Sequence, residues 1–115
     1  MRSILWGAAV LVASAMAQPA SAQTVTSFYT GKDVLDQCKT DRKWCTGYIM
    51  GVVDGVTSYA SYTKSRQIFC IPSGPTAGEI TDAVIAYLKT KPDLQYDASS
   101  YVMLALHDAY PCSKS

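Results

Sequence analysis

Apolar and small residues recur with a helical period over Trp44–Thr63, the longest part of the chain without a proline or a run of charge. The apolar positions follow three- and four-residue spacings that place them on one broad helix face: Tyr48, Ile49, Val52, Val53, Val56, Tyr59 and Ala60. Beside that face, Gly47, Gly51 and Gly55 recur every fourth residue and form a strip without side chains. The pattern predicts one long helix that frays over Tyr62–Ser65.

The glycine strip, Gly47, Gly51 and Gly55, weakens such a helix, because each glycine costs about 1 kcal/mol relative to alanine. The close approach of a second backbone is the usual compensation for that cost. We favour a tight crossing with another helix of the same chain as the interpretation. The alternative is that the strip docks a partner chain, as a dimer surface does.

A short helix is predicted ahead of the long one. Thr30, followed three residues later by Asp33, resembles a capping box and predicts a helix over Gly31–Cys38. The polar segment after this helix offers Thr40 and Asp41 as candidate N-caps for the long helix.

A third helix is predicted in the second half of the chain. Thr76 with Glu79 forms another capping-box pattern, which opens a helix that continues to about Thr90 and stops before Pro92. Its apolar positions keep the helical spacing: Ile80, Ala83, Val84, Tyr87 and Leu88. The connector before it, Arg66–Pro75, contains prolines and a glycine that exclude a helix. Three apolar residues should pack this connector onto the core: Ile68, Phe69 and Ile71.

The last helix is predicted over Ala98–Tyr110, with Asp97 as its N-cap and Pro111 directly after its end. One face of it is apolar: Tyr101, Val102, Ala105, Leu106 and Ala109. No segment of the chain alternates convincingly with period two, as a half-buried strand would. The sequence therefore predicts an all-α fold, a small bundle of one short and three longer helices.

The first 22 residues have the pattern of an export signal. Arg2 precedes a short apolar run, Ile4–Met16, and Ala20-Ser21-Ala22 supplies the small residues that a signal peptidase recognises. Ala15-Met16-Ala17 is a second candidate cleavage site. The run is shorter than the roughly 20 apolar residues that a spanning helix needs. We therefore predict a signal peptide over 1–22 and a soluble periplasmic domain over 23–115 without a membrane anchor.

The charge of the exported domain points to neither nucleic acid nor an anionic membrane as a partner. Without Arg2, the chain's ten basic residues become nine, which balance its nine acidic residues. Such a domain lacks the basic excess that attracts phosphate-rich partners.

The four cysteines, Cys38, Cys45, Cys70 and Cys112, all lie in the exported domain. An even number of cysteines in so small an exported domain predicts two disulfides. A zinc site is disfavoured, because the cysteines form no CxxC pair and the single histidine, His107, is not beside them.

Loop entropy does not choose among the three pairings that four cysteines allow. Short connections favour antiparallel neighbours, so the three longer helices should run up, down and up. Cys38 and Cys45 then share one end of the bundle, and Cys70 and Cys112 share the other, which predicts the pairs Cys38–Cys45 and Cys70–Cys112. The first pair requires a helix break between Lys39 and Asp41, because seven helical residues span about 10.5 Å and a disulfide needs Cα atoms roughly 4.4–6.8 Å apart.

Residues that could carry catalysis are few. His107 is the only histidine, and its neighbour Asp108 points elsewhere on a helix. With every cysteine oxidised, no thiol remains for a Cys–His pair, and serine-elbow, phosphate-loop and metal-binding motifs are absent from the sequence. Asp54 would be functional if buried, but we favour an exposed position or a hydrogen bond to a neighbouring helix. The sequence predicts a binding protein that is not an enzyme and uses no cofactor or metal.

Several short motifs of the chain resemble the Rap/Tai family of immunity proteins. The matching residues are Phe28-Tyr29-Thr30-Gly31, Val34-Leu35 and Cys38 at the start, then Cys45, Gly47, Tyr48, Ile49, Gly51, Val52 and Asp54, then Cys70-Ile71-Pro72, Tyr87-Leu88 with Lys91-Pro92, and Pro111-Cys112. These motifs cover nearly all of the exported domain, and their combination is specific although each is short.

The resemblance implies a periplasmic helical domain, often dimeric, that binds a type VI secretion peptidoglycan amidase and blocks its cleft. It names no effector-contacting residue, because the matched positions resemble scaffold. Two alternatives remain: a periplasmic stress chaperone of the HdeA-like kind, and a small helical binding protein without an amidase partner. A single histidine gives little charge change in mild acid, which favours the immunity protein over a chaperone, although the aspartates could drive unfolding at lower pH.

Overall fold

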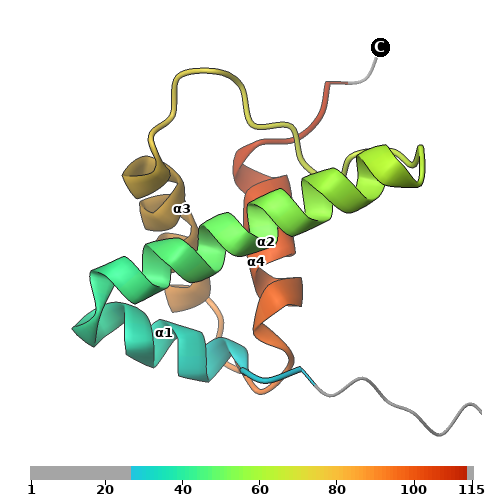
Figure 1. Cartoon of the computed structure of the whole chain (residues 1–115). Coiled ribbons are helices and arrows are strands. Elements are labelled where there is room, and N and C mark those ends of the chain that lie inside the picture. Colours follow the sequence, from blue (N-terminus) through green and yellow to red (C-terminus); the bar gives the residue numbers. More distant parts are fainter. Residues whose placement is uncertain (1–26, 114–115) are drawn as a thin grey trace, which may run out of the picture.

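The computed structural model describes residues 27–113, and this range forms four α-helices and no strand (Figure 1). The helices are α1 (Gly31–Thr40), α2 (Arg42–Tyr62), α3 (Ala77–Lys89) and α4 (Ala98–Ala109). The predicted all-α bundle of one short and three longer helices is confirmed. The predicted signal peptide over 1–22 lies outside the described residues.

One residue, Asp41, separates the first two helices. Its backbone is extended (φ −139°), its N–H donates to the Gln37 carbonyl at 2.8 Å, and its carboxylate accepts from the Trp44 N–H at 3.0 Å. Asp41 therefore closes α1 and caps α2, as the predicted break at this position requires. The break lets Cys38 and Cys45 form a disulfide with Cα atoms 4.8 Å apart.

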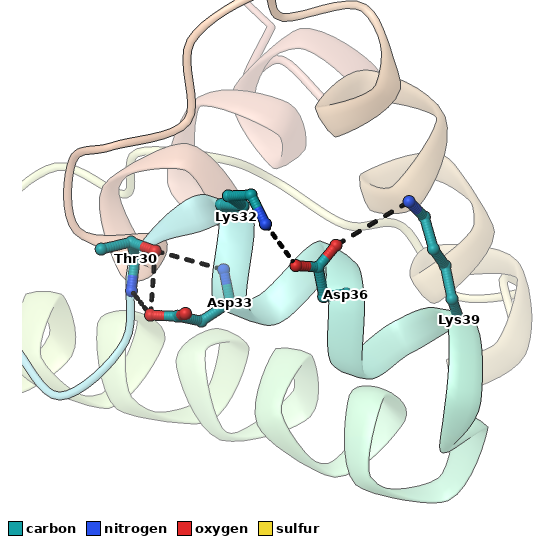
Figure 2. Close-up of polar contacts among 5 residues, drawn as sticks. All are labelled: Thr30, Lys32, Asp33, Asp36 and Lys39. Carbon is teal, nitrogen blue, oxygen red and sulfur yellow. Dashed lines mark hydrogen bonds and ion pairs between the residues drawn. The ribbon is translucent and has the colours of Figure 1, made fainter.

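Side-chain caps fix the other helix starts. Thr30 and Asp33 form the predicted capping box, in which each accepts a hydrogen bond from the other's backbone N–H (Figure 2). Asp97 caps α4 by accepting from the Ser100 N–H at 3.0 Å. The capping box predicted at Thr76 forms only in part. The Thr76 hydroxyl accepts a hydrogen bond from the Glu79 N–H.

The core lies between all four helices and takes one residue from the connector between α2 and α3. Its buried side chains include Val34, Cys45, Ile49, Phe69, Val84, Leu88, Val102 and Leu106. Phe69 is 3 % exposed, as predicted for the connector, but the same prediction is wrong for Ile68, which is 44 % exposed. The Cys70 N–H donates to the Tyr110 carbonyl at 2.8 Å, and Cys70 is bridged to Cys112, so the connector is tied to the end of α4 with Phe69 turned inward. Both predicted disulfides are thereby confirmed.

The close backbone approach in this fold occurs at Gly31. A Cβ atom there would lie 2.6 Å from the Cδ2 atom of Tyr101, whose hydroxyl donates to the Asp93 carbonyl at 2.8 Å. The Gly31 N–H also donates to the Tyr96 carbonyl at 2.9 Å. A larger residue would therefore push α1 away from the start of α4.

Helix α2 is longer than α3 and α4, which pack against it. It has 21 residues, whereas α3 has 13 and α4 has 12. Figure 1 shows α2 running across α3 and α4, with its last turns extending past α4. None of the described helices is long and apolar enough to cross a membrane.

Candidate partner-binding surface

The residues that could carry chemistry are dispersed over the surface. His107 and Asp108 are exposed on α4, and Asp54 is exposed on α2, as favoured from the sequence. All four cysteines are bridged. Within residues 27–113, no three His, Cys, Asp or Glu side chains gather closely enough to hold a metal ion. The remaining candidates are surfaces that can bind another molecule.

The glycine strip of α2 faces away from the bundle. A Cβ atom built on Gly47, Gly51 or Gly55 would meet no other described atom within 4 Å. Ile49, which is completely buried, marks the core side of α2, and Gly51 follows it by two residues, about 200° around the helix. The favoured interpretation, a tight crossing within the chain, is therefore wrong.

Aromatic side chains bound the glycine strip at both ends. At the start of α2, the rings of Trp44 and Tyr48 stack with centroids 5.4 Å apart, and Tyr29 meets both edge-on at 5.3 and 5.8 Å. Burial in this cluster, followed by the negative charge of Asp97, raises the pKa of Tyr48. At the far end of α2, Tyr59 is 70 % exposed and Tyr62 is 88 % exposed. Exposed aromatic rings are characteristic of protein interfaces.

An apolar groove opens where the end of α2 extends past α4, and we call it the α2–α4 groove. It has a volume of about 400 Å³ and is lined by Gly55, Val56, Tyr59, Ala60, Ser65, Arg66, Ile68 and Met103. Arg66 is the only charged residue in this lining. Tyr59 is 70 % exposed and Ile68 is 44 % exposed, and exposed apolar side chains that gather in one patch mark interaction sites.

A second, more polar cleft lies along the outer face of α1. Its volume is about 540 Å³, and its lining is Phe28, Tyr29, Asp33, Asp36, Gln37 and Thr40. The two carboxylates are already engaged: Asp33 with Thr30, and Asp36 with Lys32 at 2.7 Å (Figure 2). Hydrogen bonds from Thr30 lower the pKa of Asp33, and a hydrogen bond from Lys32 lowers that of Asp36. This cleft is a solvated charged face and a weaker candidate than the groove.

The Rap1a immunity proteins match this chain over residues 30–112. The chain belongs to this family. The matched range contains the four helices, both disulfides, the glycine strip and the α2–α4 groove, and it confirms the resemblance to the Rap/Tai immunity proteins. No curated protein and no solved structure gives a significant match. Membership of the Rap1a family implies that the binding partner is a protein effector.

Sequence reasoning missed the groove of this Rap1a-family protein. It placed Tyr59 on the apolar face of the long helix, where a tyrosine can belong to the core or to a binding surface, and it expected Ile68 to pack onto the core. The apolar face of α2 continues past the point where α4 crosses it (Figure 1). That crossing point is set by the packing of the whole bundle, so no local pattern in the sequence marks the groove.

Proposed function

We propose that this Rap1a-family protein is a periplasmic immunity protein that binds a type VI secretion peptidoglycan amidase and blocks its cleft. The family match over residues 30–112 is the observation that carries the proposal. The export signal predicted over 1–22 supports the proposal, because it would direct the protein to the compartment where peptidoglycan is exposed to such an effector. The protein acts by binding and contributes no catalytic group of its own.

The fold suits an inhibitor that must hold its shape. One disulfide joins α1 to the start of α2, and the other ties the connector to Cys112, three residues past the end of α4. A surface held in its binding conformation loses little conformational entropy when it docks, so more of its contact energy appears as affinity. The uncovered apolar surface beside this scaffold supplies area for that contact.

The glycine strip supports a second part of the proposal, a homodimer formed through α2. Three exposed glycines weaken α2 by about 1 kcal/mol each, and the described chain offers no internal compensation for that cost. A helix from a second copy could approach this strip closely and contact the aromatic rings at its ends. The strip and the α2–α4 groove share Gly55. Gly51 and Val56, however, are about 140° apart around the helix, so a dimer centred on Gly51 leaves the part of the groove formed by Ile68 and Met103 accessible.

Co-expression in the periplasm tests the main proposal. Each peptidoglycan amidase encoded in the same genome is exported with and without this protein, and growth is followed. We expect one amidase to lose its toxicity, and the purified pair to reach full inhibition at equimolar amounts. An unrelated exported helical protein serves as the control. The proposal fails if the toxicity of every amidase is unchanged, or if the purified protein itself digests peptidoglycan.

A further inference from the structure

The α2–α4 groove has the size and chemistry of a pocket for a large apolar side chain. Val56 and Ala60 of α2, Ile68 of the connector and Met103 of α4 contribute apolar surface, and Tyr59 stands beside them. Its volume of about 400 Å³ falls in the range of roughly 300–1,000 Å³ that ligand pockets occupy. Met103 adds a flexible, polarizable side chain that can adapt to different partners.

Two cationic residues follow α2 beside the groove's lining in the sequence. Arg66 is part of the lining, and Lys64, which is not part of it, directly precedes the lining residue Ser65 in the turn after α2. Both residues are exposed. The ion pairs among the described residues involve other cations: Lys32 and Lys39 with Asp36, and Arg42 with Asp82. The two charges are therefore available to a partner.

Lys64 occupies a strained backbone position. With φ 56°, it is the only residue other than glycine with a positive φ among the described residues. This left-handed conformation is unfavourable for a residue with a side chain, and glycine usually occupies it at helix ends. The turn needs only the backbone here: the Lys64 N–H donates to the Ser61 carbonyl at 3.2 Å, and the Ser65 N–H donates to the Ala60 carbonyl at 2.8 Å. The favourable effect of a cation at a helix C-terminus offsets only part of that cost.

Three features together define one kind of occupant. The groove is apolar, Arg66 in its lining has no ion-pair partner among the described residues, and Lys64 nearby occupies a backbone position where glycine would be less strained. We propose that the α2–α4 groove anchors the protein effector through a bulky apolar side chain that is flanked in its sequence by carboxylates. The apolar side chain fills the groove, and the carboxylates pair with Lys64 and Arg66. This inference rests on the proposed function and specifies which surface of the immunity protein receives its partner.

Lys64→Gly separates binding from folding. Glycine relieves the backbone strain, so the variant should melt at or above the wild-type temperature. It should nevertheless bind the effector roughly twofold to fivefold more weakly, the effect expected for one exposed ion pair, and with a smaller salt dependence. Lys64→Glu should weaken binding further. Lys43→Glu is the matched control, because it makes the same charge change on an exposed lysine at the other end of α2. Unchanged binding by Lys64→Glu, or equal losses in both glutamate variants, overturns the proposal.

A second experiment is independent of the effector. Labelled mature protein is titrated with three capped tripeptides and followed by NMR: tryptophan between two aspartates, tryptophan between two lysines, and alanine between two aspartates. We expect shifts gathered on Gly55, Tyr59, Ile68 and Met103 with the first peptide only. Equal shifts with the other peptides, or shifts centred elsewhere, contradict the proposal. Concentration-dependent shifts of Ile68 and Met103, which lie outside the glycine strip, would show without peptide that a second copy covers the groove, and that result also overturns it.

The two experiments also distinguish the groove from the wider function. If an amidase is inhibited but Lys64→Glu binds it normally, the groove assignment alone is wrong. If the first peptide binds in the groove but no amidase is neutralised, the amidase proposal fails and the groove remains an acidic-peptide site.

Discussion

The Cα atoms of Cys38 and Cys45 lie 4.8 Å apart, although seven residues of continuous helix would separate them by about 10.5 Å. Asp41 accounts for the difference. Its extended backbone turns the chain between α1 and α2, its N–H closes the first helix on Gln37, and its carboxylate opens the second on Trp44. One residue thus supplies the C-cap, the N-cap and the corner that lets the disulfide form.

The first prediction compares the two disulfides. Replacing Cys38 and Cys45 together by alanine should lower the free energy of unfolding by about 2.5 kcal/mol, and replacing Cys70 and Cys112 by about 4 kcal/mol. The larger loss follows from the longer loop, since the sequence separations are 7 and 42 residues. Urea unfolding of the wild type and both double variants measures the difference. A larger loss for the Cys38–Cys45 pair would contradict the loop-entropy account.

Local signals explain why most of this fold could be predicted from the sequence. Capping residues such as Thr30 and Asp97 act within one helical turn, and prolines end helices wherever they stand, so neither depends on distant contacts. The predicted bounds missed two residues at the end of α1 and two at the start of α2. The missed residues include Thr40 and Arg42, which are polar and add nothing to the apolar pattern.

The direction of the glycine strip and the existence of the groove could not be predicted in the same way. An apolar face and a strip of small residues lie side by side on α2, and the sequence does not say which one the rest of the chain covers. That choice depends on how far α3 and α4 reach along α2, which is a property of the whole bundle. Gly31 was missed for a similar reason, because its close neighbour Tyr101 is distant in sequence.

The second prediction contrasts two glycines. Gly31→Ala should destabilise the protein by roughly 1–3 kcal/mol, because the new Cβ atom would lie 2.6 Å from the Tyr101 ring. Gly47→Ala should stabilise the monomer by about 0.5–1 kcal/mol, because Gly47 is helical and its Cβ position is open. Denaturant unfolding in dilute solution, where the monomer dominates, tests both. Equal effects of the two substitutions would show that these environments are not as described.

The third prediction concerns acid stability. Hydrogen bonds from Ser100 and Ser99 lower the pKa of Asp97 below its ordinary value of 3.8. A carboxyl group whose pKa is lowered by folding stabilises the fold above its unfolded pKa, and that contribution is lost as the pH falls through the lowered value. Asp97→Asn keeps a capping side chain but cannot titrate, so its unfolding free energy should fall less than that of the wild type between about pH 5 and pH 2. Parallel acid dependence in the two proteins would rule out Asp97 as a contributor.

The last prediction concerns Gly51, at the centre of the glycine strip. Gly51→Leu should leave the monomer at least as stable as the wild type, because the Cβ position is open and leucine is the better helix former. The same substitution should abolish the proposed homodimer, because a leucine holds a second helix away from the strip.

Sedimentation equilibrium of the wild type and Gly51→Leu over a range of concentrations measures the effect on the dimer. Thr57→Leu is the matched control, since it places the same leucine side chain at an exposed position six residues away, about 120° around α2 from Gly51. We expect the control to keep the wild-type mass at every concentration. A monomeric wild type, or a Gly51→Leu variant that still dimerises, would mean that the strip faces water and does not bind a second copy.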